Sequence, residues 1–106
     1  MSGSRIIIAD EDRLDNVHPG DVLREDFLIG SEISIAEVCA GTGLPTHRIV
    51  EWLEGKGVID ADADIRLARY LGMSEGFFLG LQNDHDLEEV WLARADELNQ
   101  ITRRAA

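Results

Sequence analysis

The stretch SIAEVCAGTGLPTHRIVEWL, Ser34–Leu53, decides the fold because it reads as two short helices joined by a tight turn. Ser34 with Glu37 three residues later is a capping-box pattern, which starts the first helix. Gly43 can adopt the left-handed backbone of a sharp helix end, and Pro45 suits the first turn of the second helix. The stretch therefore predicts a helix-turn-helix, a unit that often places its second helix in the major groove of DNA.

Apolar residues supply the faces on which these two helices pack. Val38 and Cys39 form the inner face of the first helix. Ile49, Trp52 and Leu53 follow the i, i+3, i+4 spacing of one apolar stripe on the second. Because Cys39 is small, it lets the two helices cross closely, and we interpret it as a buried structural residue.

The whole chain has the composition of one modest helical domain. It has 106 residues, 44% of them hydrophobic, and its two prolines both stand near expected helix starts. No apolar run reaches about 18 residues and the first turns are polar, so neither a membrane span nor a signal peptide is expected. A single cysteine excludes an internal disulfide and is typical of a reducing compartment, which predicts a cytoplasmic protein.

The charge of the chain limits how it can bind DNA. The formal net charge is −11, from 21 acidic and 10 basic residues. DNA-binding proteins usually carry a basic face, because neutralisation of phosphates supplies much of their affinity. The acidity therefore predicts weak, salt-sensitive DNA binding, a basic protein partner, or both.

Helices are also expected on both sides of the central stretch. They are predicted at residues 18–28, from Asp60 or Asp62 to Leu71, and from Ser74 onward. The glycines expected to end helices or to lie in the loops between them are Gly30, Gly55, Gly57 and Gly72. The apolar residues expected to face the core are Val22, Leu23, Phe27, Ile65, Ala68, Leu71, Phe77, Phe78 and Leu81.

Two terminal segments complete the expected organisation, which is a tail at 1–17, a helix-turn-helix domain at 18–86 and an amphipathic helix at 87–106. In the tail, the run RIIIA at residues 5–9 either pairs with a partner or lies on the core, or the tail is loosely attached, and residues 10–16 form an acidic linker. The terminal helix either folds back on the core or forms an interface. Its apolar stripe contains Leu87, Val90, Trp91, Leu98 and Ile101.

Three segments together resemble the HigA/VapI-type antitoxins, which belong to the lambda-repressor-like (Xre) helix-turn-helix proteins. They are HPGDVLREDFL at residues 18–28, the central helix-turn-helix, and IRLARYLGMSEGFFLGLQNDHDL at residues 65–87. The patterns HPG-x-x-LRE-x-F and RLA-x-x-LG-x-S-x-x-F-x-x-x-LQ are fairly specific to that branch. The resemblance covers about residues 18–87, some two-thirds of the chain.

The resemblance implies an all-α, five-helix bundle that is usually a homodimer. It also implies a partner toxin, typically a basic, ribosome-dependent, mRNA-cleaving RNase of the HigB/RelE kind. The antitoxins of this family usually neutralise the toxin and repress their own operon.

The chain departs from the family pattern at positions that matter for DNA binding. Ile35 stands where Gln commonly begins the first helix of the motif, and Gly57 removes one cation after the second helix. Cys39 replaces a common Ala, and Phe78 replaces a common Trp. These departures leave the expected fold unchanged and lower the expected DNA affinity.

The second helix of the motif carries the candidate DNA contacts. Thr46, His47, Val50 and Glu51 are expected to face base edges. Thr46 can bond a base or a phosphate, His47 can donate to guanine, and Glu51 can accept from the amino group of cytosine. For Thr46 and Glu51, the alternative is an ordinary solvated helix face.

Arg48 and Lys56 are the expected phosphate contacts. The alternative for Arg48 is an ion pair with a neighbouring acid such as Glu51. Arg66 and Arg69 are interpreted as surface pairs, because their helix faces elsewhere.

No metal site, cofactor or catalytic centre is expected. His18, His47 and His85 are far apart in sequence and no cysteine pair accompanies them. His18 is expected to shape the first helix start and His85 to lie at the surface. No pair of carboxylates in a cleft, nucleophile elbow or phosphate loop can be identified, so an enzyme is not expected. Two other functions stay open, a solitary Xre-type regulator without a toxin and a protein-interaction module that has lost DNA binding.

Overall fold

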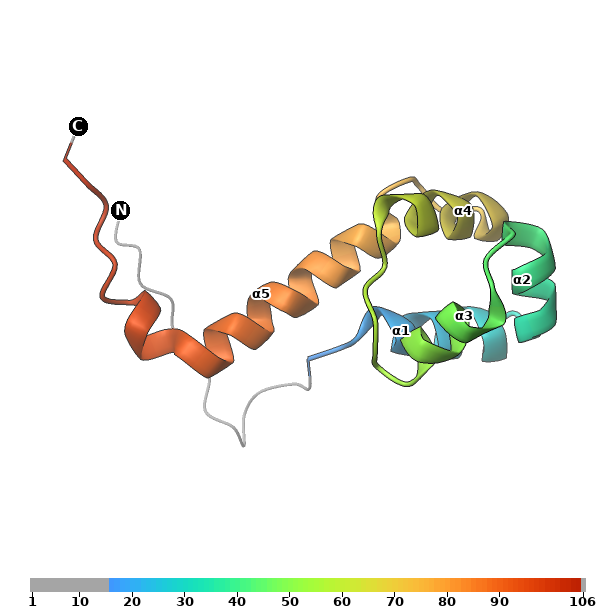
Figure 1. Ribbon diagram of the computed structural model, residues 1–106, viewed down its shortest axis with the longest axis horizontal. Helices are drawn as coiled ribbons and strands as arrows, with labels where there is room; N and C mark the ends of the chain where they lie inside the picture. Colours follow the sequence, from blue (N-terminus) through green and yellow to red (C-terminus); the bar gives the residue numbers. More distant parts are fainter. Residues whose placement is uncertain (1–15, 106) are drawn as a thin grey trace.

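The structure, a computed structural model, describes residues 16–105, and every regular element in that part of the chain is helical (Figure 1). The helices are α1 (Pro19–Val22), η2 (Leu23–Ile29), α2 (Ile35–Thr42), α3 (Thr46–Leu53), α4 (Ala61–Leu71) and α5 (Phe77–Leu98). The expected all-α fold is therefore confirmed. The RIIIA run and residues 10–15 of the expected acidic linker lie outside the described residues.

The core lies where η2, α2, α3 and α4 meet the start of α5. Trp52 and Phe78 are its largest fully buried side chains. The other buried apolar residues of this core are Leu23, Val38, Leu44, Ile49, Ile59, Ala63 and Leu67. Cys39 and Leu53 are partly buried against the core, as the apolar spacing of the central stretch predicts.

The predicted helix ends are confirmed where they depend on local sequence. Ser34 accepts from the backbone N–H of Glu37, whose side chain accepts in return, so the capping box is complete. Gly43 ends α2 with φ 77° and Gly72 ends α4 with φ 75°, both in the left-handed region. Asp60 caps α4, which decides between the two expected caps.

The first helical segment is continuous but has wider turns in its second half. The sequence predicted one helix over residues 18–28. The structure divides it into α1 and the π-helix η2, in which Gly30 N–H donates to Glu25 O. Nothing in the residue spacing indicates this change of helix type.

The predicted inner face of α4 is wrong at Ile65, which is 40% exposed. The buried stripe of α4 instead contains Ala63, Asp64, Leu67 and Ala68. The stripe is displaced because the Asp64 carboxylate is buried, where it accepts hydrogen bonds from the start of α5.

Asp64 is fully buried and accepts three backbone hydrogen bonds from the start of α5. The N–H groups of Gly76, Phe78 and Leu79 donate to it at 2.5, 2.8 and 3.0 Å. These are groups that the first turn of a helix leaves without partners within the helix. Asp64 therefore joins α4 to α5 and orients the long helix relative to the bundle.

The long helix α5 differs from the sequence prediction at both ends. It begins at Phe77 with Gly76 as its cap, whereas Ser74 was the expected start. The terminal amphipathic segment, expected as a helix over 87–106, continues α5 but is helical only as far as Leu98. Within α5 the backbone leaves helical angles at Arg94 (φ −135°, ψ 24°).

The second half of α5 runs away from the bundle (Figure 1). Leu87, Val90 and Ile101 of the predicted stripe are exposed and Trp91 and Leu98 are half-buried, and none of the five packs on the described core. Of the two expected arrangements for the terminal segment, the first is therefore wrong. Within residues 16–105, no helix combines the length and the apolar character that crossing a bilayer requires.

His18 shapes the start of α1, as predicted. Its Nδ1 accepts from Gly20 N–H at 2.9 Å, and Asp21 accepts from the His18 N–H, which completes a second capping box. The expected surface position of His85 is wrong, because its ring packs edge-on against His18 with centroids 4.9 Å apart. Burial lowers the pKa of His18 from 6.5, and the nearby His85 lowers it further, against the opposite effect of Asp21 and Asp86.

This lowered pKa predicts that acidification destabilises the protein through His18. The unfolded chain binds the proton more readily than the folded chain between the unfolded pKa of 6.5 and the lowered folded pKa. The contribution is therefore complete above pH 6.5 and is lost as pH falls below it. Urea unfolding at about pH 7.5 and about pH 5.5 measures the effect. His18→Asn keeps a capping side chain without a titrating ring and should lose less stability than the wild type. Equal losses would contradict the assignment.

Candidate nucleic-acid interface

The turn between α2 and α3 is held by its own polar groups. Thr42 Oγ1 donates to Val38 O at 2.6 Å and accepts from Leu44 N–H at 3.1 Å. Pro45 is the N-cap residue of α3, one position before the expected first turn, and its backbone carbonyl accepts from Arg48 N–H. Because these bonds satisfy the turn internally, the angle between the two helices is defined without any ligand.

The outward face of α3 presents most of the predicted DNA contacts together. Thr46, His47 and Glu51 are exposed and Val50 is half-buried, while Ile49 and Trp52 point into the core. Lys56 is exposed just beyond the end of the helix. The helix thus has one face in the protein and one face free for a groove.

Thr46 has an intramolecular neighbour that sequence reasoning did not anticipate. Its Oγ1 lies 3.5 Å from Cys39 Sγ across the motif. Cys39 is therefore partly accessible at the hinge of the two helices, and is not a fully buried residue. A DNA contact through Thr46 competes with this weak bond.

Arg48 is held by groups of the protein itself. Its guanidinium is 3.4 Å from the Asp60 carboxylate and lies over the Trp52 ring, 5.1 Å from the ring centroid. The sequence offered an ion pair with Glu51 as the alternative role of Arg48. An ion pair is present, but its partner is Asp60 on the far side of the loop.

The Asp60 carboxylate binds two groups, one with each oxygen. One oxygen accepts from Ala63 N–H at 2.9 Å and caps α4, and the other faces Arg48. The pKa of Asp60 is lowered, first by the Ala63 hydrogen bond and also by the Arg48 charge. The group is therefore ionised at neutral pH, and so the Arg48 charge is partly neutralised there.

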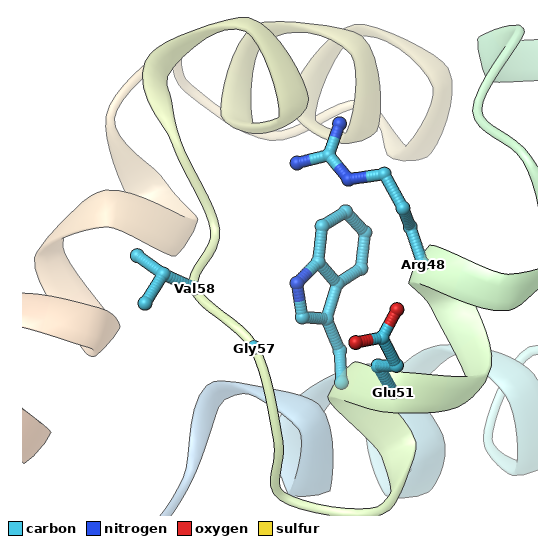
Figure 2. Close-up of a pocket in the computed structure, with 5 residues that line it drawn as sticks. Arg48, Glu51, Gly57 and Val58 are labelled. Carbon is cyan, nitrogen blue, oxygen red and sulfur yellow. The ribbon is translucent and has the colours of Figure 1, made fainter.

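A shallow hollow of about 200 Å³ lies beside this pair, between α3 and the loop that leads to α4. Figure 2 shows Arg48 and Glu51 on the helix facing Gly57 and Val58 on the loop. Trp52 completes the lining. Val58 is 66% exposed at the edge of the hollow, and sequence reasoning did not include it among the site residues.

Two other arginines donate to backbone carbonyls at the ends of the motif's helices. Arg66 pairs with Asp62 at 2.9 Å, and it also donates to Thr42 O at the end of α2. Arg24 donates to Leu53 O at the end of α3. Each helix of the motif therefore has an arginine at its negative end, where a cation is favourable. Arg69 pairs with Glu75, as its interpretation as a surface residue predicts.

Carboxylates share the exposed face with the candidate contacts. Glu51 on α3 and Glu54 at its C-terminal end are exposed, and Asp60 faces Arg48. The cations of the same region are Arg48 and Lys56. The carboxylates outnumber the cations, so the local charge is negative, in contrast to the basic face that DNA binding usually requires. In the part of the chain that the structure describes, no group of histidine, cysteine and carboxylate side chains is arranged to hold a metal ion.

Comparison with known proteins identifies related molecules. No protein-family model matches the chain. The virulence-associated protein I of Dichelobacter nodosus is 30% identical over 82 residues, which cover 77% of this chain and 76% of that protein. The antitoxin HigA of Pseudomonas aeruginosa, solved with the higBA promoter, is 27% identical with a TM-score of 0.77, covering 86% of this chain and all of that one.

A third relative is the antitoxin GraA, solved in complex with its operator. It is 29% identical with a TM-score of 0.78, and the match covers 90% of this chain and 97% of that one. Sequence similarity, overall fold and the arrangement of the motif therefore agree. This chain belongs to the HigA/VapI-type antitoxins, a family of lambda-repressor-like helix-turn-helix proteins.

Proposed function

We propose that this chain is the DNA-binding antitoxin of a type II toxin–antitoxin pair and the repressor of its own operon. The observation that supports this most is the exposed face of α3 on a rigid motif, in a chain whose relatives HigA and GraA were solved with promoter and operator DNA. In this proposal α3 enters the major groove of the operator. A homodimer would place two such helices about 34–36 Å apart on a palindromic site.

The candidate contacts take distinct roles. His47, Val50 and Glu51 face base edges, where His47 donates to guanine and Glu51 accepts from cytosine. Thr46 contacts a base or a phosphate at the start of the helix. Lys56 and Arg48 contact phosphates, which position the helix but carry no sequence information.

The acidity of the chain suits a second partner. A toxin of the HigB/RelE kind, an mRNA-cleaving RNase, is expected to be basic, and opposite charges accelerate encounter. With a net charge of −11, this chain would neutralise such a toxin in the cytoplasm while binding DNA only through the local surface around α3. No step of catalysis is assigned to the chain.

One observation favours a different function. Glu51 and Glu54 are both exposed at the helix that would enter the groove, where a carboxylate repels phosphate. A protein-interaction module that has lost DNA binding would explain them. A solitary regulator without a toxin is distinguished by the absence of a small basic reading frame beside the gene.

Substitutions on and beyond α3 test the DNA-binding part of the proposal. Lys56→Ala is expected to weaken binding to all DNA sequences and to reduce the salt slope of log K by about 1. His47→Ala is expected to cost about 1–3 kcal/mol of discrimination between the operator and altered sequences. Electrophoretic mobility shift at several salt concentrations measures both effects.

Arg69→Ala is the matched control for the loss of a cation. Arg69 is exposed on α4, pairs with Glu75, and is not among the candidate DNA contacts. It should bind the operator like the wild type. If Lys56→Ala and His47→Ala also bind like the wild type, α3 does not enter the groove.

A further inference from the structure

We infer that Asp60 sets the DNA affinity of this chain by neutralising Arg48, the only Lys or Arg in α3. The inference rests on the proposed DNA-binding function and adds a positioning residue that does not itself contact DNA. Asp60 and a DNA phosphate compete for the same guanidinium. The chain therefore binds DNA more weakly than its exposed cations alone predict.

The geometry divides the support of Arg48 between two groups. Trp52 is fully buried, so its ring is a fixed surface, and the guanidinium lies above it at 5.1 Å. Asp60 meets only one terminal nitrogen, at 3.4 Å. Trp52 therefore fixes where Arg48 lies, and Asp60 mainly changes how much positive charge Arg48 presents.

The pair lies where a phosphate has access to it. The Arg48 side chain is 29% exposed and the Asp60 side chain 60% exposed. The hollow lined by Arg48 and Gly57 opens between the helix and the loop, on the flank of α3 that faces the start of α4 (Figure 2). An anion can therefore approach Arg48 without any movement of the backbone.

The Arg48–Asp60 ion pair is weak enough for a phosphate to replace the carboxylate. Exposed ion pairs of one long side chain and one carboxylate are weak, so a phosphate can displace Asp60. The displaced carboxylate then remains beside the phosphate and repels it. Both effects act in the same direction, and together they lower the affinity about two- to fivefold.

Asparagine at position 60 separates the charge from the structural role. Asp60 uses Oδ1 to cap α4 through Ala63 N–H and Oδ2 to meet Arg48. Asparagine caps helices about as well as aspartate, and its carbonyl oxygen can keep the bond to Ala63. Asp60→Asn therefore leaves α4 in place and removes only the negative charge facing Arg48.

Asp62→Asn is the matched control, because it removes the same charge two residues further along the chain. Asp62 pairs with Arg66 at 2.9 Å, and Arg66 remains bound to Thr42 O when that pair is lost. A general effect of net charge would appear equally in both variants. An effect through Arg48 would appear only in Asp60→Asn.

The experiment measures operator binding by the full-length chain and its variants over a range of salt concentrations. Asp60→Asn is expected to bind about two- to fivefold more tightly at low salt, because Arg48 no longer has to exchange a carboxylate for the phosphate. Asp62→Asn should keep the wild-type affinity. Arg48→Ala should remove the gain when it is added to Asp60→Asn. Added to the wild type, in which Asp60 already neutralises the guanidinium, Arg48→Ala should weaken binding less than it weakens Asp60→Asn.

Three results would overturn the inference. The first is an equal change of affinity in Asp60→Asn and Asp62→Asn, and the second is a gain that survives Arg48→Ala. In both cases the wild type binds the operator, so the proposed function stands. The third is no binding by the wild type and by Asp60→Asn at any salt concentration, which would end the proposed function and this inference together.

Discussion

Replacing Asp64 with alanine is expected to lower the free energy of unfolding by about 3–5 kcal/mol. The carboxylate is fully buried and accepts from three backbone N–H groups at the start of α5. Alanine would leave these donors in the interior without an acceptor, and the cost of each is of the order of 1–3 kcal/mol. Urea unfolding followed by circular dichroism measures the loss.

Two further variants separate capping from general charge effects. Asp64→Asn keeps one acceptor oxygen and should lose less stability than Asp64→Ala. Asp62→Ala makes the same chemical change on the exposed side of α4, where its partner is Arg66 at the surface. Its effect should stay within about 1 kcal/mol. A loss at Asp64 no larger than that at Asp62 would show that α5 is not fixed to α4 by this carboxylate.

Replacing Gly20 with alanine is expected to cost about 3 kcal/mol or more. A Cβ at this position would stand 1.7 Å from Trp52 O and 2.5 Å from Trp52 C. These are backbone atoms of α3, so no rotation of a side chain can relieve the overlap. The first helix would have to move away from α3, and the bond from Arg24 to Leu53 O would weaken with it.

Gly80→Ala is the control for this substitution. Gly80 lies inside α5, and a Cβ there would meet nothing within 4 Å. Alanine should stabilise the helix by up to about 1 kcal/mol, because it has the better helix propensity. Thermal unfolding of the two variants should therefore shift in opposite directions. A stable Gly20→Ala protein would show that α1 does not pack this closely on α3.

Local chemistry explains why so much of the helix-turn-helix was predictable. The Ser34–Glu37 box and the glycines at 43 and 72 act within a few residues, so their patterns are visible in the sequence. The exposed face of α3 follows from the same spacing that buries Ile49 and Trp52.

Contacts between distant residues explain the wrong predictions. Ile65 was expected to face the core. The buried face of α4 is instead set by Asp64, which accepts from three N–H groups at the start of α5. His85 was expected at the surface, but it packs on His18 from 67 positions earlier in the chain. The Arg48–Asp60 pair likewise depends on the path of the loop between α3 and α4. Hydrophobic spacing contains no information about such pairs.

The central claim is tested most directly by the affinity of the wild-type chain for the DNA upstream of its own gene. A scrambled fragment of the same length is the control, and binding is measured at about 50 mM and about 200 mM salt. We expect saturable binding of the upstream fragment that weakens steeply with salt and exceeds binding of the scrambled fragment at both concentrations. Equal binding of the two fragments, or no binding at the lower concentration, would contradict it.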